Sequence, residues 1–153
     1  MGAAWFYHLT RSPVENTLGV LLPKALSAGW RVAVRCPNED VLDRLDEALW
    51  RGDGFLPHGR AGGAHDADQP VLLTTATRAA NDPNCLMVLG QSEIATEEVN
   101  TLDRVCLLFE GADPTAVEAA RTRWKRLTEA GVSAVYWSEE TGSWVKKAEA
   151  GGD

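Results

Sequence analysis

The chain has 153 residues, the usual length of one domain, and its 44% hydrophobic and 24% charged residues are typical of a globular protein. No apolar run approaches the roughly 20 residues that span a membrane, and no basic stretch precedes an apolar one at the N-terminus, so we expect a cytoplasmic location. The formal net charge of -7 disfavours sequence-independent binding to nucleic acid, which depends on phosphate neutralisation by Lys and Arg.

Apolar strands are predicted to alternate with helices along the chain. In chain order, the expected elements are a strand at 5–9, a helix at 12–28, a strand at 31–35, a helix at 39–51, a glycine-rich loop at 55–69, strands at 71–74 and 85–89, a short helix at 97–102, a strand at 105–109, a helix at 113–130, and strands at 134–137 and 144–145. This alternation predicts a single α/β domain at 1–147, with a mostly parallel central sheet and helices on both faces. A flexible C-terminal tail is expected at 148–153.

Two helix starts carry clear signals. Ser12, Pro13 and Glu15 match the pattern of an N-cap, a first-turn proline and a capping box. Asp113 also precedes a proline and is expected to cap the last helix. Pro23 lies inside the first helix and predicts either a kink or an earlier end to its regular bonding.

Motifs for nucleotide binding are missing. Parallel α/β sheets bind ligands at the carboxyl ends of their strands, and nucleotide-binding versions have glycines in the first turn. Here that turn, at 9–13, has no glycine, and the sequence has no Gly-Lys pair for a P-loop. The glycine-rich stretch at 59–63 follows a helix instead of a strand, so we interpret it as a flexible loop.

Histidines and cysteines give no metal-ligand pattern. His8, His58 and His65 share no spacing of the H-x-H or H-E-x-x-H kind, and no G-x-S-x-G motif indicates a serine hydrolase. The odd number of cysteines lacks CxxC spacing and is interpreted as buried reduced thiols, at Cys36, Cys85 and Cys106. We therefore expect no catalytic residue, no metal and no cofactor.

The most informative feature is a basic cluster around a tryptophan in a chain that is acidic overall. It consists of Arg121, Arg123, Trp124, Lys125 and Arg126. On a helix, Arg121 and Lys125 lie one turn apart beside Trp124. A carboxylate could form a two-pronged hydrogen bond with Arg121 while Lys125 adds a second charge, so the cluster predicts docking of an acidic peptide.

A structural interpretation of the same cluster fits the pattern equally well. Trp124 would then belong to the core, and the cations would form a solvated face, some of them paired with Glu118 or Glu129.

A second group of large apolar residues follows the end of the helix at 39–51. It comprises Trp50, Phe55, Leu56 and Pro57, with His58 directly after them. Such a corner either caps the core or exposes a partner site, and from the residues alone we favour capping.

Four segments resemble one known family. They read Trp5-Phe6-Tyr7-His8-Leu9, Arg44-Leu45-Asp46-Glu47-Ala48-Leu49-Trp50, Phe55-Leu56-Pro57-His58 and Arg121-x-Arg123-Trp124-Lys125. From the first strand to about Trp137, the chain resembles the chi subunit of bacterial DNA polymerase III holoenzyme. This resemblance implies a nucleotide-binding-like α/β fold that lacks a phosphate loop, and an accessory role at the clamp loader without enzymatic activity.

The resemblance also implies a partner for the basic cluster. Family members grip the acidic C-terminal tail of single-stranded DNA-binding protein. By position, Arg121 and Lys125 would be the cations of this grip, and Trp124 would be its aromatic residue where a tyrosine is expected. Arg123 and Arg126 complete the expected tail-binding set.

The corner formed by Trp50 and residues 55–58 would then bind the psi subunit, which tethers chi to the clamp loader, or a helicase-related protein. Two other functions stay open: a direct single-stranded DNA binder, in which Trp124 stacks on a base, or a helicase-associated repair factor. If the chain is an adaptor, its contact with DNA is expected to be indirect.

Overall fold

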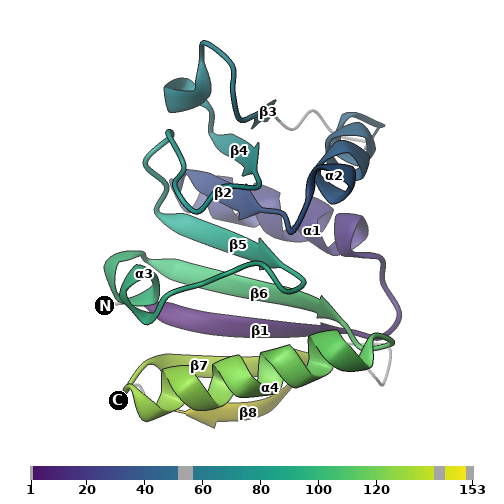
Figure 1. The fold of residues 1–153 in the computed structure, drawn as a ribbon, viewed down its shortest axis with the longest axis vertical. Helices are drawn as coiled ribbons and strands as arrows, with labels where there is room; N and C mark the ends of the chain where they lie inside the picture. Colours follow the sequence, from purple (N-terminus) through teal and green to yellow (C-terminus); the bar gives the residue numbers. More distant parts are fainter. Residues whose placement is uncertain (1, 52–56, 140–143, 151–153) are drawn as a thin grey trace.

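The structure is a computed structural model that describes residues 2–51, 57–139 and 144–150. In these residues, eight strands form one sheet flanked by four α-helices (Figure 1). The strands are β1 (Ala3–Leu9), β2 (Val32–Arg35), β3 (Gly59–Arg60), β4 (Val71–Thr74), β5 (Cys85–Leu89), β6 (Arg104–Glu110), β7 (Ser133–Ser138) and β8 (Val145–Ala150). The helices are α1 (Val14–Ser27), α2 (Glu39–Arg51), α3 (Thr96–Thr101) and α4 (Pro114–Glu129), with a 3₁₀ turn at Asp66–Asp68.

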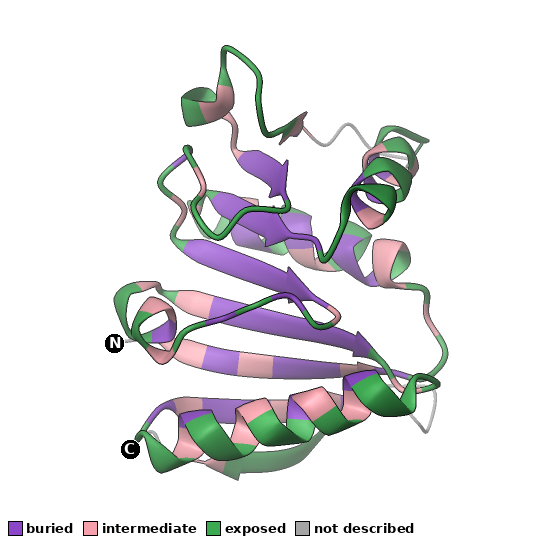
Figure 2. Cartoon of the chain, viewed as in Figure 1, coloured by how far each residue is buried: buried purple, intermediate pink, exposed green. Residues whose placement is uncertain are grey.

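The strand order is β3-β4-β2-β5-β6-β1-β7-β8, and neighbouring strands are parallel except for the antiparallel pair of β7 and β8. Helices cover both faces, α1 and α2 on one and α3 and α4 on the other. Leu22 and Leu45 are buried on the first face, and Val99 and Leu127 on the second. Figure 2 shows the buried middle strands between the exposed outer surfaces of the helices. The predicted α/β fold is confirmed.

Strand β1 contributes side chains to both cores, one on each face of the sheet. It pairs with β6 on one side and β7 on the other, so its backbone is bonded along both edges. Because successive side chains of a strand point to opposite faces, Trp5 and Tyr7 lie on the α1 face while Ala4 and Phe6 lie on the α4 face.

The carboxylate of Glu139 holds the turn between β1 and α1. Its Oε2 accepts hydrogen bonds from the backbone N–H groups of Thr10 (3.1 Å), Arg11 (3.2 Å) and Ser12 (3.0 Å). Consecutive N–H groups in a turn form an anion site, and this turn follows the strand end where a nucleotide-binding sheet holds a phosphate. Here the chain's own carboxylate occupies that position.

Glu139 also explains why one prediction is wrong. Ser12 does not cap α1, since its hydroxyl donates to Oε1 of Glu139 at 2.8 Å. The helix begins at Val14, after Pro13, which makes no side-chain capping bond. The predicted capping box is therefore absent, because a residue far away in the sequence binds the group that would form it.

The remaining predicted bounds of α1 are close to those observed. Pro23 lies inside the helix, which continues to Ser27, so regular structure does not end early. Gly29 follows with φ of +84°, and the N–H of Trp30 donates to the carbonyl of Ala25 at 3.1 Å. This is a Schellman arrangement, in which a glycine in the left-handed conformation ends the helix.

At the C-terminus, β8 is longer than the short strand predicted at 144–145. It runs from Val145 to Ala150 and so extends into the segment at 148–153 for which a flexible tail is predicted. Its pairing with β7 supplies the bonds that extend it. Residues 151–153 lie outside the described residues.

The three cysteines are buried and form no disulfide, as predicted. Burial raises the pKa of Cys36 to about 12. A hydrogen bond with Cys85, together with burial, raises the pKa of Cys106 well above its ordinary value. All three thiols therefore serve as apolar packing groups.

Two further observations concern the described residues as a set. No described helix is long and apolar enough to cross a membrane. The described His, Cys, Asp and Glu side chains form no group of three or more that could hold a metal ion.

Replacing Glu139 with Gln is expected to weaken the fold in a pH-dependent way. Burial by itself would raise the pKa of Glu139, but the hydrogen bonds from Ser12, Arg11 and Thr10 outweigh it, and the pKa lies below its ordinary 4.5. A lowered folded-state pKa gives full stabilisation above 4.5 and loses it as the pH falls. At neutral pH, Glu139→Gln should lower the free energy of unfolding by about 1.5 to 3 kcal/mol, the range for a charged hydrogen-bond partner.

Urea denaturation of both proteins, from neutral pH to about pH 3, measures this difference. The two stabilities should converge as the pH falls below 4.5. Equal stability at neutral pH, or a difference that does not change with pH, would contradict the assigned role of Glu139.

Candidate functional site

The candidate protein-binding site lies on α4, whose ends are fixed as predicted. Oδ1 of Asp113 accepts hydrogen bonds from the N–H groups of Thr115 (3.0 Å) and Ala116 (3.4 Å). Gly131 follows the helix with φ of +86°, and the N–H of Val132 donates to the carbonyl of Leu127. These caps fix where α4 begins and ends, and the buried Ala120 and Leu127 mark the side of the helix that faces the sheet.

Trp124 is half-buried against the sheet. Its ring lies 5.3 Å from that of Phe6, in a T-shaped arrangement, and 5.9 Å from that of Tyr136. Trp124 therefore packs against the core, as the structural interpretation expects, and keeps part of its indole accessible.

Arg123 and Arg126 hold the loop between β5 and α3. Arg123 donates to the carbonyls of Gly90 (3.1 Å) and Ser92 (2.5 Å), and Arg126 donates to the carbonyl of Ile94 (2.8 Å). Burial lowers the pKa of Arg123 from its usual value. Both side chains thus satisfy backbone oxygens of a segment that packs beside α4.

Arg121 and Lys125 have a different environment. Both are exposed, and they lie four residues apart on one side of α4. Among the described residues neither side chain has a hydrogen-bond or ion-pair partner, and neither Glu118 nor Glu129 pairs with them. The cluster therefore contains two cations that stabilise the fold and two that are available to a ligand.

The second predicted surface, the corner after α2, also combines exposed and buried residues. Trp50 is 55% exposed and does not cap the core, which differs from the capping that the residues alone favour for this corner. His58 is buried, with Nε2 3.0 Å from Oδ1 of Asp46 and its ring centroid 4.2 Å from that of Trp50. Pro57 is half-buried, whereas Phe55 and Leu56 lie outside the described residues.

The sequence did not predict a group of aromatic residues on the face of the sheet that α1 covers, opposite α4. It comprises Trp5, Trp30, Trp137 and Trp144, which line two adjoining cavities. The available signal was the odd-numbered aromatic positions of β1, which a strand places on one face. Their partners come from distant segments, which no local pattern connects.

Comparisons of the sequence with known proteins point to one family. A sequence model of the family described as DNA polymerase III chi subunit, HolC, matches residues 1–135. DNA polymerase III subunit chi of Escherichia coli strain K12 is 29% identical over 125 residues, which cover 78% of this chain and 82% of that protein. The same subunit of Pseudomonas aeruginosa is 32% identical over 113 residues, covering 72% and 76% respectively.

The chain therefore belongs to the DNA polymerase III chi subunit family. Membership indicates an accessory role in DNA replication and confirms the resemblance drawn from the sequence.

The two kinds of cation on α4 should respond differently to substitution. Arg123→Ala is expected to lower the free energy of unfolding by about 1 to 3 kcal/mol, because two backbone carbonyls lose a charged donor. Arg121→Ala should change it by less than about 0.5 kcal/mol, since the side chain is exposed. Urea denaturation of both variants at one pH measures the contrast, and equal losses would show that the division is wrong.

Proposed function

We propose that the chain is a non-catalytic adaptor that links the clamp loader to single-stranded DNA-binding protein by gripping that protein's acidic C-terminal tail. The observation that carries this proposal is the pair of exposed cations, Arg121 and Lys125, beside the half-buried Trp124. Membership of a family of DNA polymerase subunits supplies the replication context.

The three side chains suit the end of an acidic peptide. The guanidinium of Arg121 can donate two parallel hydrogen bonds to a carboxylate, and Lys125 adds a second charge one helical turn away. The accessible part of Trp124 offers an apolar wall for a neighbouring side chain. Since the net charge of the chain is -7, attraction of an acidic partner depends on this local pair.

Arg123 and Arg126 support the tail site without contacting the peptide directly. Their hydrogen bonds to the carbonyls at 90–94 fix the flank of the site, and their charges add to the local potential. The expected contribution of these two residues is therefore to shape and charge, with Arg121 and Lys125 making the direct contacts.

The corner at Trp50 is proposed as the tether to the clamp loader, through a psi subunit or a helicase-related protein. An exposed tryptophan held against a buried histidine is a rigid apolar anchor, of the kind that dominates protein interfaces. Pro57 continues this surface.

Absence of catalysis is part of the proposal. The carboxylate of Glu139 fills the turn after β1 in which a related sheet would bind a nucleotide phosphate, which argues against nucleotide chemistry there. A replication adaptor of this kind would work in the cytoplasm.

Fluorescence polarisation of a labelled acidic peptide ending in Asp-Ile-Pro-Phe tests the tail site. Arg121→Ala should weaken binding by about 1.5 to 3 kcal/mol, the range for a charge-assisted hydrogen bond, and affinity should fall with rising salt. Arg44→Ala, an exposed arginine on α2, is the matched control and should bind as the wild type does.

The same peptide with an amidated C-terminus sharpens the test. If Arg121 binds the terminal carboxylate, amidation should weaken binding to the wild type, and Arg121→Ala should then add little. Saturable binding that is unchanged in Arg121→Ala would remove Arg121 from the site. No binding by the folded wild type would overturn the proposed function.

A further inference from the structure

The face of the sheet under α1 is incompletely filled. Two adjoining cavities, of about 340 and 460 Å³, lie between α1 and the strands and share Trp5, Tyr7, Leu21 and Lys24. We call the two together the tryptophan groove. It lies on the face opposite α4 and therefore has no residue in common with the tail site.

Five of the described residues that line the groove are aromatic. The rings of Trp5 and Trp137 lie 5.7 Å apart, and Trp144 meets Tyr7 edge-on at 5.4 Å. Trp30 lines the other end. Four of the six tryptophans of the chain thus line one groove, and Trp144 is 37% exposed at its edge.

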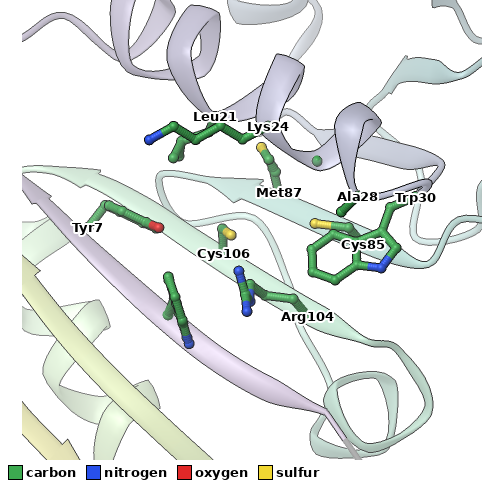
Figure 3. Close-up of a pocket in the computed structure, with 11 residues that line it drawn as sticks. Tyr7, Leu21, Lys24, Ala28, Trp30, Cys85, Met87, Arg104 and Cys106 are labelled. Carbon is green, nitrogen blue, oxygen red and sulfur yellow. The ribbon is translucent and has the colours of Figure 1, made fainter.

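A cation lies among these rings. The guanidinium of Arg104 is 3.7 Å from the ring centroid of Trp5 and 5.1 Å from that of Trp30. No described carboxylate pairs with it, and its Nε is buried without a hydrogen-bond partner among the described residues. Figure 3 shows Arg104 and the hydroxyl of Tyr7 pointing into the space beneath α1.

Other donors surround the same space. Lys24 is exposed and lines both cavities. The indole Nε1 of Trp137 is buried without a partner in the described part of the chain. Burial, chiefly, raises the pKa of Tyr7 far above its usual value, so its hydroxyl stays protonated and can donate. No Asp or Glu is among the described residues that line either cavity.

These features define the chemistry of the occupant. Unpartnered donors and cations require acceptors with negative charge, and closely spaced indoles favour flat rings. A single strand of nucleic acid supplies both, because its bases stack on aromatic side chains while its phosphates pair with cations. An uncharged peptide segment would leave Arg104 and Lys24 without a counter-charge, which makes it a poorer fit.

We propose that the tryptophan groove binds one or two nucleotides of single-stranded DNA directly, with bases stacked on its indoles and phosphate oxygens at Arg104 and Lys24. The two cavities adjoin each other, so together they fit a short segment of strand better than one free nucleotide. The contact does not depend on the tail site and would act in addition to it. Because the chain is acidic overall, binding is short-range and confined to the groove.

Anisotropy of a labelled oligothymidine, at low salt and without any partner protein, tests this proposal. Binding should quench tryptophan fluorescence, and a plot of log affinity against log salt should have a slope of about -1.4 if two phosphates are contacted. Arg104→Gln should weaken binding about tenfold or more, as expected for a lost charge-assisted contact. Trp144→Ala should weaken it about 5-fold to 150-fold, the effect of one stacked base.

Lys24→Gln is a third variant whose exposed side chain poses little risk to folding, and it should reduce the salt slope by about 0.7. Arg44→Gln on α2 is the matched control and should bind as the wild type does. Thermal unfolding followed by circular dichroism checks that each variant is folded.

Three results would overturn the proposal. The first is an absence of binding or quenching in the folded wild type. The second is an equal loss of affinity in Arg44→Gln. The third is competition by free thymidine monophosphate, or by the acidic tail peptide, at the same concentration as the oligonucleotide, which would assign the groove to another ligand.

Discussion

The double pairing of β1 is the constraint on which both candidate surfaces depend. Because β6 and β7 bond to its two edges, β1 cannot rotate, and its alternating side chains are committed to opposite layers. Phe6 supports Trp124 on the α4 face, while Trp5 supports Arg104 on the α1 face. Two neighbouring residues thus form the base of two separate surfaces.

On α4, helical geometry determines what each cation can do. Arg123 and Arg126 are three residues apart on the flank near residues 90–94, where they donate to the backbone carbonyls of Gly90, Ser92 and Ile94. Arg121 and Lys125 lie on the other flank and are exposed. A cluster that reads as one basic patch in the sequence therefore serves stability and binding with different members.

Local signals predict much of this fold. The helix at 39–51 and the strands at 71–74 and 85–89 match the structure at both ends, because periodicity and flanking turn residues determine them. The cap of α4 is also predicted correctly, since Asp113 binds N–H groups within its own turn. These contacts join residues close together in the chain.

What the sequence does not predict depends on contacts between distant segments. Ser12 fails as an N-cap because Glu139, 127 residues away, takes its hydroxyl. The tryptophan groove combines residues of β1, β6 and β7 with Trp30 after α1, and no periodicity links them. The division of the basic cluster likewise depends on where the loop at 90–94 lies. Tertiary placement decides each of these cases.

The central claim is that an acidic tail binds on α4 and nowhere near the groove. The indole N–H signals of ¹⁵N-labelled protein, recorded while the acidic peptide is added, test it most directly, with each of the six tryptophans assigned by a Trp→Phe variant. The account predicts a saturable shift of the Trp124 signal, with those of Trp30 and Trp144 unchanged. A shift confined to the groove tryptophans, with Trp124 unaffected, would contradict it.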